Sequence, residues 1–131
     1  MELQLWPAII TLLSLVVLIW VACIVGHYRK KCNVKAPAVT GDPLFERAYR
    51  VQMNTIESAI VFLPALWLAA RWGSGYLIPV AGALWIAGRI LYALAYLKDP
   101  AKRSLGFGIS FFAIILLMIQ AAIGLVRAAL A

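Results

Sequence analysis

The residues of this sequence that could do chemistry stand inside apolar stretches, and the first group comprises Arg50, Asn54 and Glu57. In a helix, which turns by about 100° per residue, these three side chains fall within about 60° of one another on one face. An ionised side chain in an apolar environment is costly unless it is paired or reaches water. The spacing therefore predicts a polar helix face that lines a bundle interior or a wet cavity.

A second group, Arg89, Tyr92 and Tyr96, has spacings of three and four residues and shares one stripe of another helix. If the two helices are antiparallel neighbours, Arg89 lies near the depth of Glu57, which is its natural acidic partner. One interpretation is then purely structural. A buried ion pair fixes the register of the helices, and the tyrosines lie at the boundary with water.

The other interpretation is a binding site, because cationic donors outnumber the acid that could satisfy them. Arg29, Arg50, Arg89 and Arg103 accompany Glu57. Arginine recognises carboxylates through paired N–H donors. The set predicts an anionic ligand that also carries an amino group for Glu57.

The elements that must position these residues are membrane-spanning helices. The chain has 131 residues, of which 65% are hydrophobic and 13% charged, whereas soluble domains are about half apolar and a quarter charged. A spanning helix needs about 20 mostly apolar residues. Four stretches satisfy this requirement, and we predict an all-α, up-and-down bundle in a single domain, 1–131, with helices at about 5–26, 43–72, 76–98 and 100–128.

The formal net charge of +7 would suggest nucleic acid as the partner of a soluble protein. Here the basic residues gather in two of the three connections: Arg29, Lys30, Lys31, Lys35, Lys98, Lys102 and Arg103. Basic loops face the cytoplasm, so we predict that these connections and the site do so, with no nucleic-acid partner. A bacterial inner membrane is the expected location, and the endoplasmic reticulum is the alternative.

Local signals mark helix starts and a packing face. Asp42 and Asp99 each precede a proline, which is typical of an N-cap followed by the first helical residue. Ala83 and Ala87, spaced by four, predict a small-residue seam for close helix packing.

Over about residues 29 to 103 the chain resembles the membrane-associated proteins in eicosanoid and glutathione metabolism, the MAPEG family. No gaps are needed between the matching positions. They are Arg29, Thr40-Gly41, Pro43, Phe45-Glu46-Arg47, Tyr49-Arg50, Gln52, Asn54, Glu57, Leu66-Trp67, Arg89, Tyr92, Tyr96 and Arg103.

The resemblance implies a homotrimer that binds glutathione between adjacent subunits near the cytoplasmic face. The residues that would hold the peptide are Arg29, Arg50, Gln52, Asn54, Glu57, Arg89, Tyr92 and Tyr96. Arg103 would face the sulfur, and Lys30 stands where the family has an arginine with an assisting role. Ser58 replaces a tyrosine that binds glutathione, a difference of one hydrogen bond or about 1 kcal/mol.

The implied function is a detoxifying glutathione transferase that attacks lipophilic electrophiles, with glutathione as co-substrate and no metal. A thiol with a pKa near 8.5 is mostly protonated at neutral pH, and the thiolate is the nucleophile. A guanidinium at about 4 Å attracts a thiolate by about 4 kcal/mol at an effective dielectric of 20. Arg103 is therefore the expected catalytic residue. The same thiolate could reduce peroxides.

Two alternatives stay open. A non-catalytic, lipid-binding scaffold of the same family would not need the full set of glutathione residues. A small multidrug exporter also has four helices and one membrane glutamate, but that glutamate belongs in the first helix, which has no charge here. An arginine in the third helix, Arg89, would also repel cationic substrates.

Overall fold

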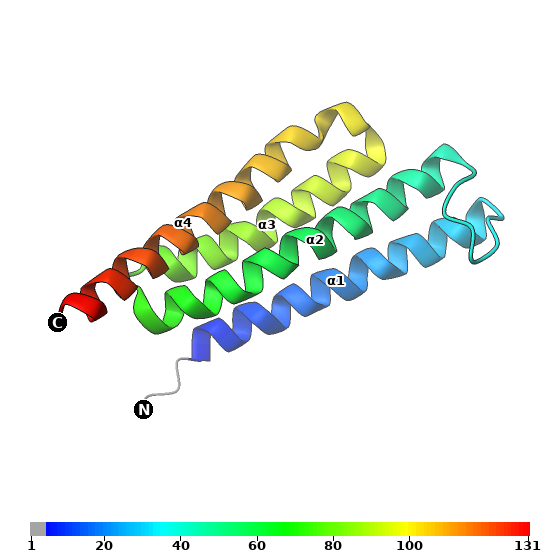
Figure 1. The fold of residues 1–131 in the computed structure, drawn as a ribbon. Coiled ribbons are helices and arrows are strands. Elements are labelled where there is room, and N and C mark those ends of the chain that lie inside the picture. The colour runs from blue at the N-terminus through cyan, green and yellow to red at the C-terminus, as the bar shows by residue number, and fades with distance from the viewer. Residues whose placement is uncertain (1–4) are drawn as a thin grey trace.

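The computed structural model describes residues 5–131 as an up-and-down bundle of four long helices (Figure 1). They are α1 (Leu5–Lys31), α2 (Pro43–Trp72), α3 (Leu77–Lys98) and α4 (Ser104–Leu130), and a short 3-10 helix, η1 (Pro100–Arg103), precedes α4. The start of α1 and the end of α4 lie at one end of the bundle, and the α1–α2 and α3–α4 connections lie at the other (Figure 1). Each long helix has the length and hydropathy to cross a membrane. The predicted all-α membrane bundle is confirmed.

The helix starts follow the capping residues of the sequence. Asp42 accepts a hydrogen bond from the backbone nitrogen of Leu44 at 2.8 Å, and Asp99 accepts one from that of Ala101 at 3.0 Å. Such caps satisfy backbone donors that the first turn leaves free. Both predicted caps are confirmed, although the second opens a 3-10 turn before α4 begins.

Helix α1 extends past Gly26, where we expected it to end, to Lys31. Three basic residues, Arg29, Lys30 and Lys31, form its last turn. Positive charge at a helix C-terminus interacts favourably with the helix dipole and the last free carbonyls. This interaction explains why the basic run continues the helix instead of ending it.

Helices α3 and α4 approach each other most closely at two glycines. A Cβ atom on Gly88 would meet the backbone nitrogen of Ser110 at 2.8 Å, and one on Gly106 would meet the carbonyl oxygen of Gly88 at 2.7 Å. Ala83 and Ala87 are exposed in the single chain. The prediction that they form a small-residue seam is therefore wrong for contacts within the chain. Backbone contact at this distance requires glycine.

A candidate glutathione site between α2, α3 and α4

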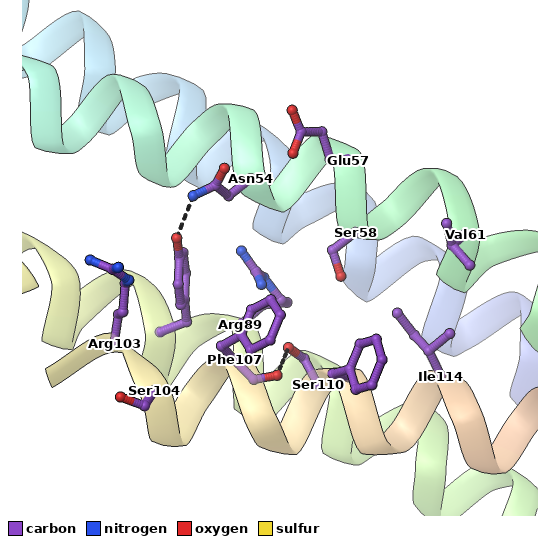
Figure 2. A pocket seen from close by; sticks show the side chains of 12 residues that line it. Asn54, Glu57, Ser58, Val61, Arg89, Arg103, Ser104, Phe107, Ser110 and Ile114 are labelled. Carbon is purple, nitrogen blue, oxygen red and sulfur yellow. Dashed lines mark hydrogen bonds between the residues drawn. The ribbon is translucent and has the colours of Figure 1, made fainter. Parts of the chain in front are cut away.

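A cavity of about 570 Å³ lies between α2, α3 and the start of α4 (Figure 2). Four elements supply its walls: residues of α2 at spacings of three and four, residues of α3, the last residue of η1, and one face of α4. The lining residues are Asn54, Glu57, Ser58, Val61, Arg89, Tyr92, Arg103, Ser104, Phe107, Ser110, Phe111 and Ile114. The predicted polar faces of α2 and α3 thus meet at one cavity.

The polar half of the cavity lies toward η1. The amide nitrogen Nδ2 of Asn54 donates a hydrogen bond to the hydroxyl of Tyr92 at 2.6 Å. The rings of Tyr92 and Tyr96 lie 5.6 Å apart, and the guanidinium carbon of Arg103 lies 5.6 Å from the Tyr96 ring. Arg103 is exposed, and its one side-chain hydrogen bond within residues 5–131, to the carbonyl of Pro100, measures 3.2 Å. Its guanidinium therefore has donors free for a ligand.

Arg89 is a buried cation that has no acidic partner among residues 5–131. Its side chain is 1% exposed, donates to Thr55 Oγ1 at 2.9 Å and lies with its guanidinium carbon 4.1 Å from the Tyr92 ring centre. Its Nε is a buried side-chain nitrogen with no hydrogen-bond partner in the described chain. An unpaired charge at this depth is costly, so a ligand anion in the cavity would stabilise it.

The ion pair that we considered between Glu57 and Arg89 does not form within the described residues. Glu57 is exposed and its carboxylate is turned away from Arg89 (Figure 2). Thr55 and Glu57 are separated by about 200° around a helix. Because Thr55 faces α3, Glu57 cannot face it as well. The purely structural interpretation of this pair is wrong for the single chain.

The other half of the cavity is apolar. Phe107 and Phe111 stack with ring centres 5.9 Å apart, and Val61 and Ile114 extend this wall. Both phenylalanines are more than half exposed, at 53% and 54%. A lipophilic molecule could enter here from the bilayer and meet a polar ligand in the same space.

Several residues of this site were not among our predictions. They are Thr55, Val61, Trp85, Ser104, Phe107, Ser110, Phe111 and Ile114. The sequence carries a signal for the apolar wall, because Phe107, Phe111 and Ile114 recur at spacings of four and three. It carries no such signal for Thr55 or Trp85.

Five of the predicted residues are not among those that line this cavity, and one of them, Tyr96, stands next to it. Arg29 and Lys30 line a different hollow of about 380 Å³ beside the α1–α2 connection. There Arg29 donates to the carbonyl of Ala38 at 2.8 Å and lies 4.6 Å from the Phe45 ring, so in the single chain it holds the connection in place. Arg50 and Gln52 are also absent from the lining.

The single chain therefore groups most of the predicted residues at one place. Asn54, Glu57, Arg89, Tyr92 and Arg103 surround the cavity. Tyr96 stands beside two of them, Tyr92 and Arg103. Cationic donors, one carboxylate and an apolar wall are the groups needed to bind an anionic peptide next to a lipophilic molecule.

Comparison with known proteins agrees with the resemblance seen in the sequence. Residues 7–123 match the MAPEG family. An uncharacterised protein of Synechocystis sp. is 41% identical over 117 residues, which cover 89% of this chain and 85% of that protein. Human microsomal glutathione S-transferase 2 is 38% identical over 101 residues, 77% of this chain and 69% of that enzyme. Bovine leukotriene C4 synthase is 31% identical over 118 residues, 90% of this chain and 79% of that enzyme. The chain belongs to the MAPEG family.

Proposed function

We propose that this protein is a membrane-bound glutathione transferase that joins the glutathione thiolate to a lipophilic electrophile. The observation that carries the proposal is a single cavity with cationic donors at one end and an aromatic wall at the other. A water-soluble peptide and a membrane-dissolved molecule can meet in such a space. The relatives named for glutathione transfer support the same chemistry.

The charges of glutathione suit the polar half. The peptide has two carboxylates, one ammonium and one thiol. Arg89 and Arg103 provide donors for anions, and Glu57 is the carboxylate available to the ammonium. The hydrogen-bonded pair of Asn54 and Tyr92 lies between them and can orient the peptide backbone.

A homotrimer would complete the binding site. Arg29, Lys30 and Gln52 do not reach the cavity of their own chain. In a closed ring of identical subunits, a residue outside its own subunit's cavity can contribute to the neighbour's. We therefore infer that glutathione lies between subunits, on the side of the basic connections. By the positive-inside rule this is the cytoplasmic side, and the inner membrane of a bacterium fits it.

Arg103 is the proposed catalytic residue. It is exposed at the cavity rim and makes one hydrogen bond of 3.2 Å. At about 4 Å from a sulfur, its charge would contribute about 4 kcal/mol at an effective dielectric of 20. Half of that attraction lowers a thiol pKa by more than one unit. Peroxide reduction would use the same thiolate.

The test is calorimetric binding of glutathione to detergent-purified protein, with an ultraviolet difference spectrum for thiolate. Lys102→Ala is the matched control, because Lys102 is an exposed neighbour of Arg103 that does not line the cavity. We expect saturable binding, thiolate absorbance in the wild type and in Lys102→Ala, and loss of thiolate and turnover in Arg103→Ala. Thiolate absorbance that survives in Arg103→Ala would refute the role of this residue.

A second candidate is a non-catalytic scaffold that holds a lipid. The exposed aromatic wall of Phe107 and Phe111 favours it, because a lipid chain could lie there without any reaction. Absence of glutathione binding at millimolar concentration, together with binding of a fatty acid, would establish the scaffold in place of the transferase.

A further inference from the structure

The hydroxyl groups inside the helices follow one pattern, and Ser58 departs from it. Thr11, Ser14, Thr55 and Ser110 each donate to the carbonyl oxygen four residues earlier, at 2.7 to 3.1 Å. This back-bond satisfies a hydroxyl in an apolar environment. Ser58 has no such bond among the described residues. Its Oγ accepts a hydrogen bond from Nε1 of Trp85 at 3.0 Å. Thr11 also accepts from an indole, Nε1 of Trp67 at 3.1 Å, but keeps its back-bond.

Trp85 is held rigidly in the core. It is fully buried, and its ring stacks on Phe62 with centres 4.1 Å apart and planes 3° from parallel. The indole has one polar group, a donor. Because the stacked ring fixes the direction of this N–H, it fixes the position of the Ser58 oxygen as well.

The donor of Ser58 is therefore left for the cavity. A serine hydroxyl has one O–H and two lone pairs, and the indole occupies a lone pair. Ser58 lines the cavity and points into it from α2 (Figure 2). A polar donor inside a protein is costly when it has no acceptor. A ligand atom that accepts a hydrogen bond would remove this cost.

Ser58 stands where the resemblance implies a tyrosine that binds glutathione, so the hydrogen bond of that tyrosine is missing here. The position of Ser58 in the cavity indicates which ligand its own hydroxyl serves. Ser58 lies one turn beyond Asn54 on α2 and is followed, three residues later, by the apolar Val61. Figure 2 shows it on the far side of Arg89 from Arg103. Arg89, four residues after Trp85 on α3, adds a buried positive charge with an unpaired Nε. An acceptor oxygen that enters from the apolar half would meet both groups.

We propose that Ser58 is a specificity-determining donor for an acceptor oxygen on the lipophilic second substrate, and that Trp85 is its positioning residue. The proposal rests on the transferase function above. The substrate class is an electrophile with a carbonyl conjugated to its reactive carbon, such as an enone. The thiolate sulfur forms a bond to the β-carbon, the π-electron pair moves to the carbonyl oxygen, and water protonates the resulting enolate. Because charge develops on that oxygen, its hydrogen bond strengthens in the transition state.

The experiment compares two electrophiles in the full-length, detergent-purified protein. One is a phenyl-substituted enone, and the other is benzyl chloride, which has no acceptor oxygen. In Ser58→Ala we expect the ratio of kcat/KM for the enone to that for benzyl chloride to fall about fivefold, which corresponds to about 1 kcal/mol. The KM for glutathione should stay unchanged.

A variant of Trp85 provides a second test of the proposal. Trp85→Phe keeps an aromatic ring against Phe62 but removes the N–H, so the Ser58 hydroxyl can turn back to the helix carbonyl. We expect the ratio to fall in this variant too. The double variant S58A/W85F should show the ratio of S58A and no additional loss, because Trp85 acts through Ser58. The double variant also removes both members of the Trp85–Ser58 hydrogen bond, so neither is left unpaired. Its stability therefore separates the loss of the donor from a folding defect.

The outcomes separate this proposal from the transferase function. An equal loss for both electrophiles, or a rise in the KM for glutathione alone, would overturn the role of Ser58 in recognising the second substrate and leave the transferase intact. A wild type that binds no glutathione and conjugates neither compound would overturn both. Additive losses in the double variant would overturn the positioning role of Trp85.

Discussion

The closest approach of α3 and α4 should control the geometry of the site, and Gly106→Ala tests this. A Cβ atom at position 106 would lie 2.6 Å from the Cα of Tyr92 and 2.7 Å from the carbonyl oxygen of Gly88, and closer still to the backbone nitrogen of Tyr92. These are backbone atoms, which cannot move aside as a flexible side chain can. The two helices must separate.

The size of the displacement follows from the contacts. Ordinary van der Waals contact with a Cβ begins at 3.4 Å, so the Tyr92 Cα at 2.6 Å must move by about 0.8 Å. Overpacking of this kind destabilises a protein by about 1–3 kcal/mol. Misplacement of a binding group by about 1 Å can lower turnover about 100-fold. The helix that must move carries Tyr92 and Arg89, so we expect activity to fall more steeply than stability.

Gly108→Ala is the matched control, since a Cβ atom at that position meets nothing within 4 Å. It should leave conjugation unchanged and stabilise α4 by up to about 1 kcal/mol. The assay is kcat/KM for glutathione conjugation beside thermal unfolding in detergent. Equal activity of Gly106→Ala and Gly108→Ala would show that the α3–α4 contact does not determine the geometry of the site.

Three further changes test individual contacts. Tyr92→Phe removes the hydroxyl that accepts from Asn54, and calorimetry should show glutathione binding weakened about fivefold, or about 1 kcal/mol; an unchanged Kd would refute this. Arg89→Met removes a buried charge that has no acidic partner in the part of the chain that the structure describes. The unfolding temperature without glutathione should therefore rise, and glutathione should raise it by less than in the wild type; a lower unfolding temperature without glutathione would contradict this. Burial raises the pKa of the Cys32 thiol, and so do the hydrogen bond and the charge of Asp42, while Lys31 lowers it. Asp42→Asn should therefore lower this pKa, still cap α2, and move the pH profile of Cys32 alkylation to lower pH; an unmoved profile would exclude a contribution from Asp42.

Features that depend on neighbouring residues were predictable from the sequence. Asp42 and Asp99 cap helices because a carboxylate before a proline meets free backbone donors, whatever the rest of the chain does. The four membrane-spanning helices could be predicted from the length of the apolar stretches alone. The polar stripe through Asn54 and the stripe through Arg89 and Tyr92 follow from helical periodicity, and both do line the cavity.

Features that depend on how helices rotate against one another were not predictable. Arg89 meets Thr55 and not Glu57, because the rotation of α2 turns Thr55 toward α3. The close seam uses Gly88 and Gly106, and a single sequence does not tell which small residues of a helix face a neighbour and which face lipid. Packing fixes these rotations.

The departures from ordinary helix chemistry concentrate at the cavity. Elsewhere in the described helices, hydroxyls such as Ser14 bond to their own backbone, and caps satisfy the helix starts. At the cavity, the Nε of the buried Arg89 has no hydrogen-bond partner among the described residues, and Ser58 makes no bond to its own helix there. Local rules are broken mainly where function compensates for the cost. The unpaired Nε of Arg89 and the hydroxyl of Ser58, which bonds to an indole and not to its own helix, come from different helices and line the same space. An acceptor-bearing ligand between them explains both.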